Sequence, residues 1–76
     1  MYNFPTSITM NEALYALRSG EIPNVEGHVP AESLSLRHFV PDGENYHIDR
    51  VGYYLIVPIT TSYYKYIYVE EVKWSH

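Results

Sequence analysis

The spacing of apolar residues changes partway along this chain of 76 residues, and the change limits the folds open to it. From Ser33 onward apolar and polar residues alternate, as in a strand with one buried face. Before that point apolar residues recur at intervals of three and four, which is the spacing of one helical face: Met10, Ala13, Leu14 and Leu17. A helix followed by strands predicts an α+β fold, and residues 1–76 suit a single domain.

The helix carries signals at both ends. Thr9 is a candidate N-cap with Glu12 three residues later, so the two can form a capping box that satisfies two backbone N–H groups. Gly20 suits the left-handed residue that ends many helices, and Arg18 complements the negative end of the helix dipole. These signals predict a helix over Met10–Ser19.

The segment after the helix, Glu21 to Pro30, contains two prolines and Gly27 and is predicted to be a loop. It is longer than most connections, which makes it a candidate binding loop or extended arm. We expect Ile22 and Val25 to attach it to the core.

Three strands are expected after this loop. The first runs from Ser33 to Val40, and Asp42-Gly43 is a strong hairpin signal because both residues tolerate the positive φ of a tight turn. A two-residue turn there places His38 opposite His47. Gly52 predicts a bulge or bend in the second strand, whose pairing should end at Pro58 because proline lacks an N–H.

The last strand is predicted from Tyr63 to Trp74, after a turn at Thr60-Thr61-Ser62. The sequence therefore predicts one N-terminal helix packed on a three-stranded antiparallel β-meander, with the last strand at an exposed edge. Such an edge could pair with a second copy and form a homodimer or higher oligomer.

Tyrosine is the most unusual part of the composition. The chain has nine, and six of them lie between residues 53 and 68. One short helix can cover only one face of the sheet, yet both faces of the last hairpin are apolar or aromatic. Because tyrosine is typical of interfaces, the hypothesis is that the other face binds a partner through Tyr54, Tyr64, Tyr66, Tyr68, Trp74 and Lys65.

Two alternatives remain open for these side chains. The tyrosines could simply be strand formers that cover neighbouring backbone. Lys65 beside aromatic rings also allows a base or nucleotide to stack there. For the predicted set His38, His47 and Asp49, a divalent metal site and a pH-sensitive cluster compete with a solvated polar face, which we favour, so no metal and no cofactor are expected.

Several classes of protein are disfavoured. The chain has no cysteine, no glycine-rich phosphate loop and no nucleophile elbow, so we expect no enzyme. A net charge of −4 with five scattered basic residues argues against direct DNA or RNA binding. No apolar stretch is long enough to cross a membrane, and no secretory signal is recognisable, so a cytoplasmic location is expected.

The helix segment resembles a known family. Thr9-Met10-Asn11-Glu12-Ala13-Leu14-Tyr15-Ala16-Leu17-Arg18-Ser19-Gly20 is similar to the T-x-x-E-A-L-x-x-L-x-x-G opening of small phage proteins of the Thoeris anti-defence, signal-sequestering type. The match covers 12 of 76 residues. Those proteins continue into a basic stretch ending in Gly-Trp, whereas this chain continues as Glu21-Ile22-Pro23-Asn24. The resemblance implies a phage or mobile-element origin and transfers no ligand residue.

These observations together favour a small phage-type accessory protein that binds and inhibits a host protein, such as a defence or transcription component, in the host cytoplasm. One alternative is a homo-oligomeric sponge that sequesters a nucleotide-derived immune signal. Another is a structural subunit of a larger assembly. The sequence names no partner.

Overall fold

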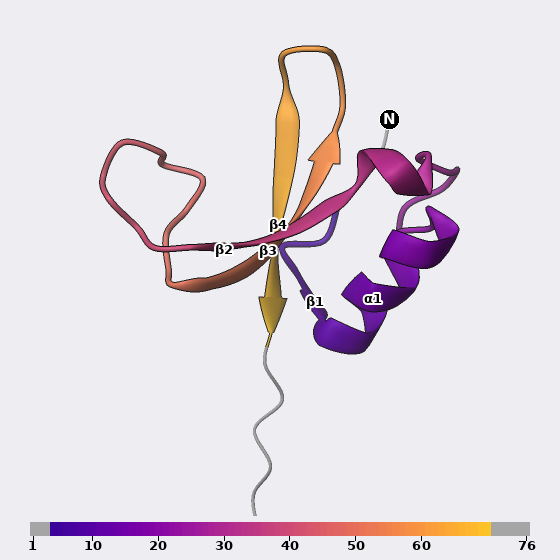
Figure 1. Ribbon diagram of the computed structural model, residues 1–76, viewed down its shortest axis with the longest axis horizontal. Coiled ribbons are helices and arrows are strands. Elements are labelled where there is room, and N and C mark those ends of the chain that lie inside the picture. The colour runs from indigo at the N-terminus through magenta and orange to yellow at the C-terminus, as the bar shows by residue number, and fades with distance from the viewer. Residues whose placement is uncertain (1–3, 71–76) are drawn as a thin grey trace, which may run out of the picture.

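Four strands form one mixed sheet in the computed structural model, which describes residues 4–70 (Figure 1). The elements follow one another as β1 (Ser7–Thr9), α1 (Met10–Ser19), the short 3-10 helix η1 (Ala31–Ser33), β2 (Ser35–Phe39), β3 (Gly52–Pro58) and β4 (Tyr64–Glu70). The strand order is β1-β4-β3-β2. The α+β class is confirmed, but the three-stranded antiparallel meander is incomplete, since the sheet has a fourth, parallel strand.

The extra strand, β1, pairs in parallel with β4, with Ser7 opposite Tyr68 and Thr9 opposite Glu70. It has only three residues, too few for a recognisable alternation, and it follows Pro5 in a segment that reads as an irregular arm. Because β1 lies on one side of β4 and β3 on the other, β4 is an inner strand. The prediction of an exposed edge at the last strand is therefore wrong for its described residues; β1 and β2 form the outer edges.

Helix α1 has the predicted bounds and the predicted ends. The Thr9 Oγ1 accepts the Glu12 N–H at 3.1 Å, and the Glu12 carboxylate accepts the Thr9 N–H at 2.8 Å. Gly20 adopts a left-handed φ of 79°, and its N–H donates to the Ala16 carbonyl at 2.8 Å. The capping box and the glycine C-cap are thus confirmed.

The buried face of α1 differs from the predicted one. Ala13 and Ala16 are fully buried, whereas Leu14, which was expected on the core face, is 45% exposed. Two alanines allow the helix backbone to approach the sheet closely, so the contact centres on them. Met10 and Leu17 pack at its margins.

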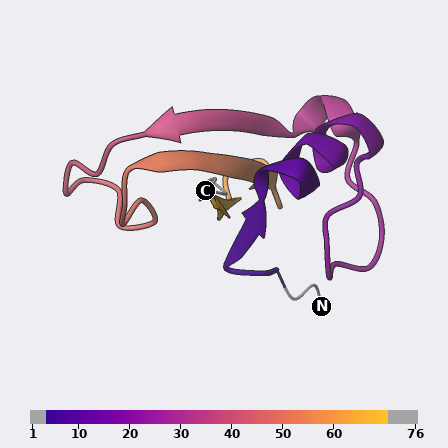
Figure 2. The ribbon, with the colours of Figure 1, turned by 90° about the horizontal axis from the view of Figure 1, so that it is seen from below.

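The core lies between α1 and one face of the sheet. Four side chains from the two central strands are completely buried there: Leu55, Val57, Ile67 and Val69. Ile8 of β1, Ile22 of the loop after α1, and Leu34 also belong to this core. Figure 2 shows α1 and the loop after it together at one end of the molecule. No helix within residues 4–70 has the length and apolarity needed to span a membrane.

The connection between β2 and β3 is a long loop rather than a tight hairpin. Phe39 pairs with Gly52 and His38 with Tyr53, so residues 40–51 lie outside the sheet. Asp42 accepts the N–H of Glu44 at 2.9 Å and so makes a local turn within this loop. The predicted pairing of His38 with His47 is therefore wrong. In Figure 1 the loop extends on the side of the molecule away from α1.

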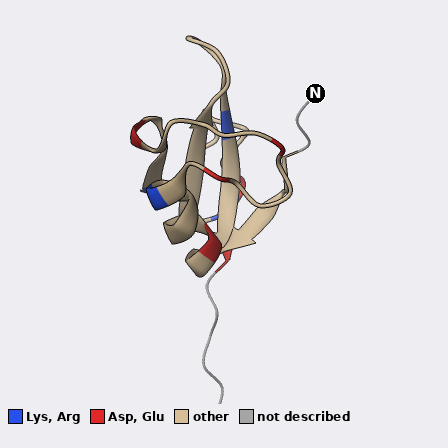
Figure 3. Ribbon diagram, turned by 90° about the vertical axis from the view of Figure 1, so that its right-hand side faces the viewer, with Lys and Arg blue, Asp and Glu red and all other residues tan. Residues whose placement is uncertain are grey.

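The second predicted turn is present. The N–H groups of Ile59 and Thr60 both donate to the Tyr63 carbonyl, at 2.9 and 3.1 Å, and close the connection between β3 and β4. Pro58 is the last paired residue of β3, as predicted for a residue without an N–H. Figure 3, which looks onto the side carrying α1, shows acidic and basic positions dispersed over several elements.

Candidate functional site

The sheet face turned away from the buried core carries the tyrosines of the central strands. Tyr54 of β3 pairs directly with Tyr68 of β4, and their rings meet edge to face with centroids 5.4 Å apart. The loop of residues 40–51 returns over this face, and its Ile48 is only 5% exposed. The expectation of a face without intramolecular cover is therefore corrected: the loop covers part of it.

Tyr54 attaches this loop to the sheet. The residue is 2% exposed, and its hydroxyl lies 3.0 Å from the Arg50 carbonyl oxygen and 3.2 Å from Asp49 Oδ1, the two acceptors for its proton. The same oxygen accepts the N–H of Arg50 at 3.3 Å. Burial raises the pKa of Tyr54 above its ordinary value of 10.0, partly opposed by the hydrogen bond from the Arg50 backbone, and Asp49 raises it further.

A cavity of about 300 Å³, here called the tyrosine pocket, opens where the loop, the N-terminal arm and β4 meet. Four of the six predicted binding residues line it. The N-terminal arm and the loop provide the rest of the wall. Its lining consists of Phe4, Pro5, Thr6, His47, Asp49, Arg50, Tyr54, Lys65, Tyr66 and Tyr68.

Ring contacts fix the walls of the tyrosine pocket. The His47 imidazole stacks on the Tyr66 ring, with centroids 5.4 Å apart and planes 20° apart. The Arg50 guanidinium lies 4.3 Å from the centre of the Tyr68 ring, a distance typical of a cation–π contact. Arg50 also has its Nε 3.6 Å from Asp49 Oδ1, an exposed ion pair that contributes little to stability.

Three hydrogen-bond donors on residues that line this pocket have no partner within residues 4–70. They are the ammonium group of Lys65 and the hydroxyls of Tyr66 and Tyr68. None of them is a buried unsatisfied group, so each is open to solvent. A ligand group with oxygen acceptors, such as a carboxylate or phosphate, can therefore be bound here beside aromatic rings.

The two other predicted binding residues are not part of this pocket. Tyr64 is 43% exposed and pairs with Pro58 at the far end of the β3–β4 hairpin. Trp74 lies outside the described residues. The structure thus brings together Tyr54, Lys65, Tyr66 and Tyr68, with Tyr54 as the buried floor.

The histidine cluster expected from the sequence is divided. His38 packs edge to face against Tyr53, with centroids 5.0 Å apart, while His47 and Asp49 line the tyrosine pocket. The described part of the chain contains no group of three or more His, Cys, Asp or Glu side chains placed to hold a metal ion. The three residues do not share the sheet register on which that hypothesis depended.

Sequence reasoning missed Arg50 and the N-terminal arm as parts of the site. Both are placed by tertiary contacts: Arg50 through the return of the loop, and the arm through the bond from the Tyr68 N–H to the Thr6 carbonyl at 3.3 Å. Neither segment carries a periodic pattern. In comparisons with known proteins, no family model, no curated protein and no solved structure matches this chain.

Proposed function

We propose that this protein is a small phage-type or mobile-element accessory protein that binds and inhibits a host protein through the tyrosine pocket. The observation that carries the proposal is a set of three donors, on Lys65, Tyr66 and Tyr68, that have no partner in the described part of the chain and belong to residues lining one cavity beside stacked aromatic rings. Tyrosine offers a large rigid contact area and a polar tip, as interface hot spots require.

The chemistry of the pocket indicates the part of the partner that it would bind. Lys65 supplies a positive charge with no partner within residues 4–70, whereas Arg50 already pairs with Asp49; the two tyrosine hydroxyls supply further donors. An acidic side chain or a terminal carboxylate satisfies these groups, while adjacent apolar side chains can contact the rings. The partner is therefore proposed to present an acidic segment, and binding alone, without catalysis, would inhibit it.

The phage-type origin has separate support. The similarity of residues 9–20 to the opening of phage anti-defence proteins motivates it. A short chain that acts only by occupying a host protein suits such a role, and the host cytoplasm is then the proposed location.

Affinity capture with matched variants tests the proposal. The wild-type protein, Lys65→Glu and Arg37→Glu are each used as bait in a bacterial lysate, followed by mass spectrometry. Arg37 is an exposed residue of β2 and controls for the reversal of charge. We expect wild type and Arg37→Glu to retain one host protein stoichiometrically and Lys65→Glu to lose it. Retention by all three baits, or enrichment by none, contradicts the proposal.

A second candidate function is supported by the size of the tyrosine pocket. Its volume of about 300 Å³ reaches the lower end of the range for small-molecule sites. Rings for stacking and cations for a phosphate are both present, so a sponge for a nucleotide-derived signal is the alternative. At a concentration about 100 times the dissociation constant, a bound nucleotide stabilises the fold by about 2.7 kcal/mol. A thermal shift with cyclic and ADP-ribose-type nucleotides, absent in Lys65→Glu, would favour this alternative over the protein partner.

A further inference from the structure

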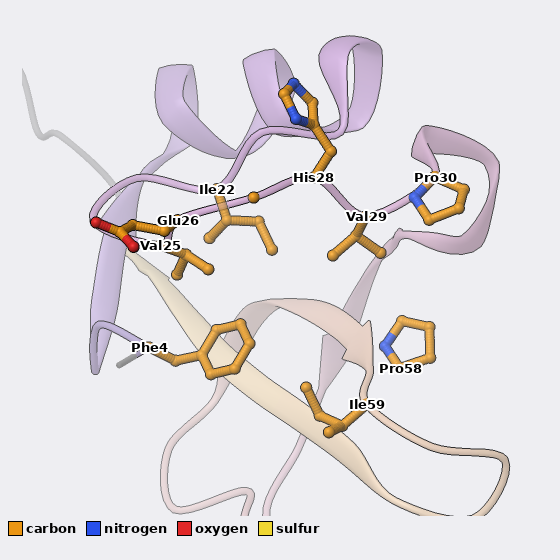
Figure 4. Close-up of a pocket in the computed structure, with 10 residues that line it drawn as sticks. Phe4, Ile22, Val25, Glu26, His28, Val29, Pro30, Pro58 and Ile59 are labelled. Carbon is orange, nitrogen blue, oxygen red and sulfur yellow. The ribbon is translucent and has the colours of Figure 1, made fainter. Parts of the chain in front are cut away.

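A second cavity, here called the apolar pocket, shares Phe4 with the tyrosine pocket and otherwise has a different lining (Figure 4). Its volume is about 240 Å³. Ile22, Val25 and Val29 project from the loop after α1 toward three side chains on the opposite wall, as Figure 4 shows. That wall consists of Phe4, Pro58 and Ile59.

Backbone hydrogen bonds hold the loop wall of this pocket. The N–H of Val25 donates to the Ile22 carbonyl at 3.1 Å, and the N–H of Val29 donates to the Gly20 carbonyl at 3.0 Å. Ile22 is 4% exposed and joins the loop to the core. The wall is therefore formed before a ligand arrives, which lowers the entropy lost on binding.

The charge at the rim of the pocket is negative. Glu26 is exposed, lines one end of the pocket, and has no hydrogen-bond or ion-pair partner within residues 4–70. His28 turns away from Phe4 and Ile59 in Figure 4, and its Nε2 lies 3.1 Å from Glu21 Oε1. Among residues 4–70 no Lys or Arg lines this pocket, so none of them neutralises the Glu26 carboxylate there.

We propose that the apolar pocket binds a compact apolar group that carries a positive charge. The pocket is smaller than the roughly 300–1,000 Å³ of sites for drug-sized ligands, so one ring or branched chain fills it. Apolar walls favour the apolar part of the ligand, and Glu26 favours an adjacent ammonium group. The group comes from a free aromatic amine or from a peptide in which an apolar side chain adjoins a lysine. The two pockets share the Phe4 side chain, but this proposal does not rest on the proposed function of the tyrosine pocket.

The test is a titration followed by NMR of methyl and amide groups in the full chain. Phenethylammonium is the probe, and 2-phenylethanol is its neutral counterpart. We expect phenethylammonium to shift the methyl signals of Ile22, Val25 and Ile59 and to bind more tightly than the alcohol. Equal affinity for the two probes, or shifts confined to other regions, overturns the proposal.

Two variants separate the charge from the apolar wall. Glu26→Gln should weaken the binding of phenethylammonium by up to about fivefold, the range of an exposed ion pair. The affinity for 2-phenylethanol should stay unchanged. Glu44→Gln, in the loop of residues 40–51, should change neither. Ile59→Gln should weaken both probes severalfold, and because Ile59 is 40% exposed this variant is expected to fold. An unchanged affinity in both Glu26→Gln and Ile59→Gln overturns the proposal.

The origin of the ligand is tested by the capped dipeptides acetyl-Phe-Lys-amide and acetyl-Ala-Lys-amide. Tighter binding of the first than of phenethylammonium supports a peptide as the natural ligand. If phenethylammonium binds and acetyl-Phe-Lys-amide does not, the result supports a free amine as the natural ligand. Binding of neither probe overturns the proposal.

Discussion

The backbone carbonyl of Val29 lies against Gly20 so closely that a Cβ atom built on Gly20 would be 2.1 Å from the Val29 oxygen. Gly20 also has a left-handed φ of 79°, and its own carbonyl accepts the Val29 N–H at 3.0 Å. One glycine therefore ends α1 and closes the base of the loop that forms a wall of the apolar pocket.

Gly20→Ala should destabilise the protein by at least about 2 kcal/mol. A left-handed conformation costs a non-glycine residue roughly 1–2 kcal/mol, and here backbone atoms of Val29 must also move. Gly43→Ala is the matched control, since Gly43 has a φ of 85° but no atom within 4 Å of an added Cβ. Urea denaturation should show the larger loss for Gly20→Ala. Equal losses would mean that the close approach of Val29 carries no energetic cost.

Ile48→Ala should cost about 2–4 kcal/mol, because Ile48 is a 5% exposed side chain in the loop of residues 40–51 and the substitution leaves a cavity. Val51→Ala, at a position 57% exposed in the same loop, should change the free energy of unfolding by less than about 0.5 kcal/mol. Equilibrium denaturation measures both. A neutral Ile48→Ala would contradict the burial of this side chain.

Tyr54→Phe should destabilise the fold by about 1–2 kcal/mol. The variant keeps the ring but removes the hydroxyl that lies 3.0 Å from the Arg50 carbonyl and accepts the Arg50 N–H. Tyr64→Phe is the control, since Tyr64 is 43% exposed and should tolerate the change. Amide hydrogen exchange at Arg50 should become faster in Tyr54→Phe but not in Tyr64→Phe, which would attribute the loss of stability to the hydrogen bonds between Tyr54 and Arg50. Identical stability of the two variants would argue against this role.

The raised pKa of Tyr54 predicts a dependence of stability on alkaline pH. Burial makes the folded state hold the phenol proton more tightly than the unfolded state does. The resulting stabilisation is fully present below pH 10.0, the ordinary value, and is lost as the pH rises through the higher pKa of the folded state. Between about pH 9 and about pH 11, wild type should lose more stability than Tyr54→Phe. If the free energy of unfolding fell equally with pH in the two proteins, the raised pKa of Tyr54 would be contradicted.

Thr9→Ala should cost about 1 kcal/mol by removing the side chain that accepts the Glu12 N–H at 3.1 Å. Thr9→Ser retains this acceptor and should be nearly neutral. Thermal denaturation followed by circular dichroism distinguishes the two variants. A comparable loss in both would place the role of Thr9 in its strand rather than in the capping box.

The helix could be predicted from the sequence because its signals are local. Thr9, Glu12 and Gly20 act within a few residues of their partners, so the bounds of α1 depend little on the rest of the fold. The buried face was harder to predict. Leu14 fits the helical spacing, but the close contact of Ala13 and Ala16 with the sheet turns it outward.

Three of the predicted site residues share a pocket because alternation along β4 places Tyr66 and Tyr68 on one face, and pairing places Tyr54 beside Tyr68. Alternation assigns Lys65 to the other face, so its place in the lining of this pocket does not follow from the strand pattern. The register of β2 could not be obtained in the same way. Asp42-Gly43 favours a tight hairpin, yet burial of Ile48 and the hydroxyl of Tyr54 stabilise a long loop.

The sequence by itself determined one capped helix, a change to strands and a concentration of tyrosines, since these depend on near neighbours or on a period of two. Only the tertiary structure decided that β1 joins the sheet, that β4 lies inside it, and that Arg50 and the N-terminal arm enclose the tyrosine pocket. Those arrangements depend on contacts between residues far apart in the chain. The free energy of each contact depends on how deeply its residues are buried, and no local sequence pattern records it.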